Sequence, residues 1–69
     1  MDLFQELMQE KDEIMLQSLS GNKVDFTRLR KLAVDFADSN DVDLKTDGTD
    51  EELWKSVIGY FRNLLKESR

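Results

Sequence analysis

Apolar residues recur at helical spacing in three separate segments of the chain. In an α-helix, residues three and four apart lie on one face, so this spacing predicts an amphipathic helix with one buried stripe. The segments 3–19, 26–38 and 50–67 follow the pattern, and the connections between them are short. Amphipathic helices with short connections pack against one another around a shared core. The pattern therefore predicts an all-α fold, a compact three-helix domain that spans residues 1–69.

Local signals mark the ends of the predicted helices. Asp2 and Asp25 are suited to cap the first two helices, because Asp accepts hydrogen bonds from the free N–H groups at a helix start. Gly21 is suited to the left-handed position that follows a helix. Thr49 and Glu52 have the spacing of a capping box, in which two side chains and two backbone N–H groups bond reciprocally. These signals agree with the boundaries that the apolar stripes predict.

The segment 42–48 is expected to be non-helical. Val42 and Leu44 alternate with charged residues, which predicts a short extended stretch with two apolar side chains directed inward. The dipeptide Asp47-Gly48 is a turn signal. A short extended segment should therefore connect the second helix to the third.

The apolar stripes of the first and third helices are each wide enough to contact two neighbours. Because small cores often need an additional partner, this width favours association with another protein or with a second copy of the chain. Trp54 has the largest apolar area in the chain, and the sequence is compatible with a core position or an interface position for it. The residues expected at such an interface are Met8, Lys11, Met15, Trp54, Ile58 and Leu65. On the third helix, a ridge of positive charge flanks Trp54, Ile58 and Leu65 and is formed by Lys55, Arg62, Lys66 and Arg69.

Composition restricts the chemistry that the chain can perform. It contains no His and no Cys, which removes the commonest general base, the commonest transition-metal ligand and the thiolate nucleophile. A chain of 69 residues also has little material with which to enclose a substrate. We therefore expect a non-catalytic protein with no cofactor, no bound metal and no small-molecule substrate.

The formal net charge of −5 shapes the choice of partner. An acidic protein is repelled by nucleic-acid phosphates and anionic membranes, whereas basic protein surfaces attract it. No apolar run approaches the roughly 20 residues that span a bilayer, and the first residues lack the features of a signal peptide. These observations favour a cytoplasmic protein that binds proteins, and they leave open an inhibitor that mimics nucleic acid to block a basic protein.

Acidic residues are concentrated between Asp35 and Glu52. Calcium prefers oxygen ligands, and in an EF-hand loop over this stretch Gly48 would take the glycine position. That frame places Lys45 and Trp54 where carboxylates are required, which excludes an EF-hand. An irregular divalent-ion site and a solvated acidic rim both remain open.

Three basic residues near the start of the second helix offer an alternative function. Arg28, Arg30 and Lys31 are candidate nucleic-acid contacts, although their helical angles scatter over roughly 160°.

The order of elements around these residues resembles a known type of unit. The second helix, the stretch Val42-Asp43-Leu44, the turn Asp47-Gly48-Thr49 and the start Glu52-Leu53 resemble the helix–extended loop–helix units of SAP, LEM and HeH domains. The resemblance covers about half the chain and implies nucleic-acid binding as an alternative function. SAP-type binding uses basic residues near the turn, where this chain has Asp47, Asp50 and Glu51.

Overall fold

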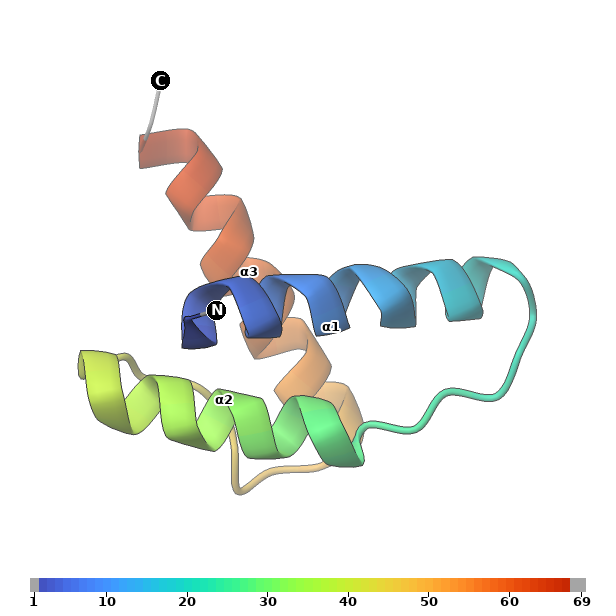
Figure 1. The fold of residues 1–69 in the computed structure, drawn as a ribbon, viewed down its shortest axis with the longest axis horizontal. Coiled ribbons are helices and arrows are strands. Elements are labelled where there is room, and N and C mark those ends of the chain that lie inside the picture. Colours follow the sequence, from blue (N-terminus) through green and yellow to red (C-terminus); the bar gives the residue numbers. More distant parts are fainter. Residues whose placement is uncertain (1, 68–69) are drawn as a thin grey trace.

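The computed structural model describes residues 2–67, over which the chain forms three α-helices and no strand. Helix α1 spans Leu3–Leu19, α2 spans Thr27–Asn40 and α3 spans Asp50–Glu67. Helices α1 and α2 lie side by side and run in opposite directions, while α3 crosses behind them (Figure 1). The predicted all-α three-helix fold is therefore confirmed. Within residues 2–67, no helix combines the length and the apolar character that crossing a membrane requires.

The core lies where the three helices meet. Each helix contributes the inner part of its apolar stripe, and the segment between α2 and α3 adds one leucine. The buried hydrophobic residues are Leu7, Ile14, Leu29, Leu32, Ala33, Phe36, Leu44, Leu53 and Val57. Among residues 2–67 no polar or charged residue is buried, so the core is held together by apolar contacts.

Aromatic rings join the helices around this core. Phe4 of α1 lies 6.0 Å from Phe36 of α2 and 5.5 Å from Phe61 of α3, measured between ring centroids. Nearer the start of α3, Trp54 packs edge-on against Phe26, with centroids 6.0 Å apart and ring planes at 62°. Tilted and edge-to-face pairs are the favoured arrangements of aromatic rings. Trp54 is thus half-buried and packs against the fold.

The predicted caps of α1 and α3 are present. Asp2 Oδ1 accepts a hydrogen bond of 2.8 Å from the Gln5 N–H, and Gly21 adopts a left-handed φ of 77° after α1. At the start of α3, the Thr49 N–H donates to Glu52 Oε1 (3.1 Å) and the Glu52 N–H donates to Thr49 Oγ1 (3.2 Å). These two bonds form the capping box that the sequence predicts.

Helix α2 differs from its prediction at both ends, since it spans Thr27–Asn40 rather than 26–38. Asp25 Oδ1 accepts hydrogen bonds from the Thr27 N–H (2.9 Å) and the Thr27 hydroxyl (2.7 Å). This local turn leaves Phe26 outside the helix, as its N-cap residue. Asp25 therefore supports the helix start from one residue farther away than expected.

At its other end, α2 continues past Asp38 because the polar residues there bond to the helix backbone. The Asn40 side-chain amide donates to the Phe36 carbonyl (3.0 Å). Asp41 then adopts the left-handed conformation, with φ 54° and ψ 46°, and the Val42 N–H donates to the Ala37 carbonyl (3.1 Å). This bond closes the helix in the manner that glycine usually permits.

The segment 42–48 is non-helical and directs its apolar residues inward, as predicted. Leu44 is buried in the core and Val42 packs against it. The Lys45 N–H donates to Ser56 Oγ (3.2 Å), which ties the segment to α3.

Candidate functional site

The three predicted nucleic-acid contacts lie in different surroundings. Arg30 joins α2 to the beginning of α3, because its guanidinium donates to the Thr46 carbonyl and, at 2.8 Å, to Asp50 Oδ1. Hydrogen bonds from a charged donor are stronger than neutral ones. Arg30 therefore holds the 42–48 segment against both helices, which is a structural role.

Arg28 points toward α1 rather than toward Arg30. Its Nε lies 3.2 Å from Glu10 Oε1, in a depression lined also by Glu6, Gln9 and Glu13. Lys31 is exposed and lines a different depression, together with Arg30 and the carboxylate-bearing residues Asp25 and Asp50. The structure thus brings two of the three cations together and separates the third. A phosphate at either depression would meet carboxylates as well as cations.

The acidic stretch between Asp35 and Glu52 is dispersed in space. Asp50 pairs with Arg30, Glu52 caps α3, and Glu51 lies 3.2 Å from Lys55 one turn along the helix. Across the part of the chain that the structure describes, no three carboxylates converge so that they could hold a metal ion.

Among residues 2–67, two carboxyl groups have a pKa that is shifted from its ordinary value. The hydrogen bond from the Thr49 N–H holds the pKa of Glu52 below its ordinary value, and the bond from the Thr27 N–H does the same for the pKa of Asp25. Both carboxylates accept backbone N–H bonds at or near a helix start, where a negative charge is favoured. These groups serve the fold.

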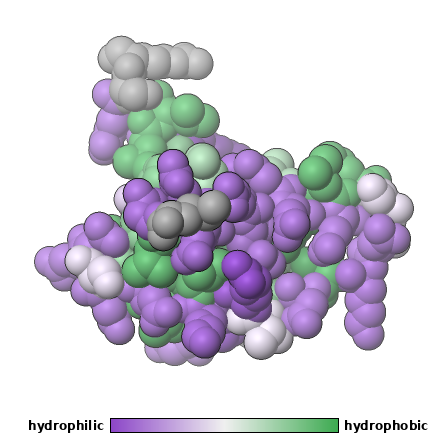
Figure 2. Space-filling model, in the orientation of Figure 1, coloured by the Kyte–Doolittle hydropathy of each residue, from purple (hydrophilic) through white to green (hydrophobic). Residues whose placement is uncertain are grey.

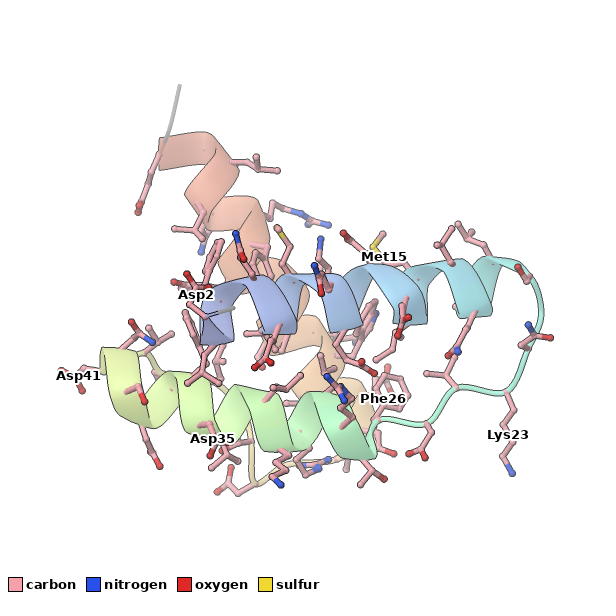
Figure 3. All side chains as sticks on the ribbon, viewed as in Figure 1. Asp2, Met15, Lys23, Phe26, Asp35 and Asp41 are labelled. Atoms are coloured by element: carbon pink, nitrogen blue, oxygen red, sulfur yellow. The ribbon has the colours of Figure 1, made fainter. Side chains whose placement is uncertain are left out.

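A groove between α1 and the C-terminal half of α3 gathers most of the predicted interface residues. This α1–α3 groove is lined by Lys11, Met15, Ile58, Phe61, Arg62 and Leu65. Four of the six residues predicted for a protein interface meet here, namely Lys11, Met15, Ile58 and Leu65. Met15 projects from α1 on the side away from α2 (Figure 3). Met8 is half-buried elsewhere on α1, and Trp54 packs against Phe26 instead.

Lys11 lies on the seam between α1 and α3. Its Nζ lies 5.1 Å from the centroid of the Phe61 ring and 2.7 Å from Asp12 Oδ1, and its side chain is only 17% exposed. A cation within about 6 Å of an aromatic ring is attracted to the ring face. This contact explains why a lysine occurs within an apolar stripe, and it places one positive charge at the edge of the α1–α3 groove.

Three other residues of the groove are more open to solvent. Met15 is 43% exposed and Leu65 is 70% exposed. Arg62 is exposed, and no ion pair of Arg62 occurs among residues 2–67. Lys66 is exposed one turn farther along, while Arg69, which the sequence adds to the same ridge, lies outside the described residues. Apolar side chains with cations beside them therefore remain uncovered in this structure.

Sequence reasoning missed two parts of this surface. Phe61 lines the groove although the sequence does not mark it as an interface residue, whereas Arg62 lines it as a member of the expected ridge of positive charge. At the end of α1, Leu16 is 65% exposed and Leu19 is 83% exposed, and we call this pair the α1 tip. Leu16 lies two residues beyond the buried Ile14 and so about 160° around the helix. The position of Leu16, an apolar residue almost opposite the buried stripe, is the sequence signal that predicts an exposed apolar surface here.

Figure 2 shows the apolar surface at the C-terminal end of α1 and over the C-terminal part of α3. Comparisons of the chain with protein-family models, curated proteins and solved structures find no match. Any assignment of function therefore starts from this surface.

Proposed function

We propose that this chain is a non-catalytic protein-interaction module whose contact surface is the α1–α3 groove. The observation that carries the proposal is the exposure of apolar side chains in a groove with cations at its edge, with Leu65 70% and Met15 43% exposed. Apolar surface that stays in water loses the free energy that burial would gain, about 25 cal/mol per Å². A second protein surface that covers the groove recovers this free energy.

The composition supports a binding role over a catalytic one. The chain has neither His nor Cys, so acid–base or nucleophilic catalysis would depend on carboxylates and lysines. The carboxylates with shifted pKa values, Asp25 and Glu52, accept hydrogen bonds that stabilise helix starts. Neither of them lines the groove.

Site-specific photo-crosslinking in cells of the source organism tests the proposal. One variant carries p-benzoylphenylalanine in place of Leu65, in the groove, and the matched control carries it in place of Val34 on α2. Val34 is also an exposed apolar residue, at 38%, but it does not line the groove. We expect a protein adduct at position 65 that is weak or missing at position 34. Equal adducts at both positions, or none at either, would sink the proposal.

Nucleic-acid binding is the alternative, and the α2–extended segment–α3 arrangement is the observation that favours it. It depends on Arg28, Arg30 and Lys31, of which Arg28 and Arg30 are paired with Glu10 and Asp50. Binding through phosphates weakens steeply as salt is added, because counterions are released. A titration of DNA and RNA at two salt concentrations that detects no salt-dependent binding removes this alternative.

A further inference from the structure

The charge of the chain is divided unevenly between the two helices that form the groove. Helix α1 contains four acidic residues and one basic residue, Lys11. Helix α3 carries its acidic residues at its two ends, Asp50 to Glu52 and Glu67, whereas the range 53–66 between them contains three basic residues and no acidic one. One copy therefore presents an acidic helix and a basic helix side, which attract each other when they meet across two copies.

The apolar surface of the chain is divided in a complementary way. The α1–α3 groove is concave, whereas the α1 tip projects from the end of α1 as two exposed leucines. Asp12 lies one helical turn before Leu16, so a negative charge accompanies the α1 tip. Arg62 is in the groove and Lys66 follows it one turn later on α3. An apolar, acidic projection and an apolar, basic groove thus occur on the same chain.

From these two observations we infer that the partner in the α1–α3 groove is a second copy of this chain. Each copy inserts its α1 tip into the groove of the other, with Asp12 of one copy near Arg62 of its partner. The arrangement has two-fold symmetry, so each contact is made twice and the surface is closed. The inference rests on the proposed function and names the partner.

A second copy covers more of the exposed apolar surface than an unrelated acidic helix does. An unrelated helix in the groove would leave Leu16 and Leu19 in water, whereas the symmetric pair covers the groove and the α1 tip together. A domain of 69 residues buries only about 60% of the surface that its unfolded chain exposes, and association is a common way to add to a small core. Both arguments favour self-association.

Sedimentation equilibrium of the full chain, from about 1 μM to about 1 mM, measures the association. We expect a reversible dimer. Leu19→Glu places a charge in the apolar contact and should weaken the dimer at least about 100-fold, while the control Val34→Glu should leave it unchanged. Helical circular dichroism of both variants checks that they are folded.

A charge exchange identifies the pairing. Asp12→Lys and Arg62→Glu should each weaken the dimer about tenfold, and the double variant should recover most of that loss because the pair is restored with reversed sign. Asp12 also contacts Lys11 within its own copy, so recovery in the double variant, which a purely internal effect would not give, is the decisive result.

The outcomes separate the inference from the proposed function. A wild-type chain that stays monomeric throughout the concentration range overturns the inference, and so does a dimer that Leu19→Glu leaves intact. If a different protein is then crosslinked at position 65, the proposed function stands without the inference. A monomer with no adduct at position 65 overturns both.

Discussion

The two halves of α3 lie in opposite surroundings. In the N-terminal half, Leu53 is fully buried, Asp50 is bonded to Arg30, and Glu52 closes a capping box. In the C-terminal half, Leu65 is 70% exposed. The helix thus begins with side chains that are bonded or buried within the chain and ends with an exposed apolar side chain.

This difference indicates which part of the helix stabilises the fold and which part is available for contact. Polar groups in the N-terminal half bond within the chain, and their loss would leave partners unsatisfied. In the C-terminal half, Phe61 still packs on Phe4, but Arg62 and Leu65 are exposed, so substitution of these two changes the surface with little effect on folding. Matched substitutions in the two halves test this division.

The largest difference is expected between two leucines of α3. Leu53→Ala should lower the free energy of unfolding by about 2–5 kcal/mol, because it removes buried methyl groups and leaves a cavity. Leu65→Ala should change it by less than about 0.5 kcal/mol in a dilute, monomeric sample. Urea denaturation of both variants measures the effect. Similar losses in the two variants would contradict the division of α3.

Two arginines provide the next comparison. Arg30→Met keeps an apolar stem but removes the donors to Thr46 and Asp50, so we expect a loss of about 1–2 kcal/mol in the free energy of unfolding. Arg62→Met, in the groove, should cost less than about 0.5 kcal/mol. Thermal unfolding at one low protein concentration compares them. If Arg62→Met proves the more destabilising, the role assigned to Arg30 is wrong.

Two glycines differ in the space around them. A Cβ added to Gly59 meets no atom within 4 Å, so Gly59→Ala should raise the free energy of unfolding by about 0.5–1 kcal/mol through better helix propensity. The open space also shows that no helix packs closely on Gly59 within the described chain. A Cβ at Gly48 would lie 3.1 Å from Glu52 Oε1 and 3.2 Å from Glu52 Cβ. Gly48→Ala should therefore disturb the capping box and destabilise the protein.

The same denaturation measurement decides between the two glycines. Stabilisation by Gly59→Ala together with destabilisation by Gly48→Ala supports the contrast between the bonded start of α3 and the later part of the helix. Equal stabilisation by both substitutions would show that the capping box tolerates a side chain at position 48.

The smallest effect concerns pH. The pKa of Glu52 is held below its ordinary value of 4.5 in the folded protein, so its contribution to stability is present above that pH. This contribution is lost as the pH falls through the lowered pKa, because protonation weakens the bond from the Thr49 N–H. Glu52→Gln keeps a capping-box side chain but removes the titration. We expect its free energy of unfolding to fall less steeply than that of the wild type between about pH 5 and pH 3. Parallel pH profiles would refute this role.

The helix starts could largely be predicted because their signals are local. The bonds of Asp2 and of the Thr49–Glu52 box join residues three positions apart, so the sequence order already contains them. The predicted end of α2 at residue 38 is too early because Asn40 bonds back to the helix and Asp41 adopts a left-handed conformation. Asn and Asp make such backbone bonds and adopt the left-handed conformation in loops as well. The residue types alone therefore do not show whether the helix ends at residue 38 or continues to Asn40.

The candidate site could be predicted only in part because it depends on how helices cross. The sequence shows that Met15 and Ile58 each lie on an apolar stripe, but not that α1 and α3 cross and leave these residues around one groove. Arg30 illustrates the same limit, since its acceptors lie 16 and 20 residues away in the chain. Contacts of that kind follow from the packing of the helices and not from spacing along one of them.

The edge-on packing of Trp54 on Phe26 has a spectroscopic consequence. Trp54 is the sole tryptophan of the chain, and it contacts the N-cap residue of α2 while standing apart from the α1–α3 groove. Its fluorescence should therefore follow the docking of α2 against α3 and stay almost constant when the groove is filled. Trp54 fluorescence thus reports folding, and association of the chain can be titrated without a change in this fluorescence.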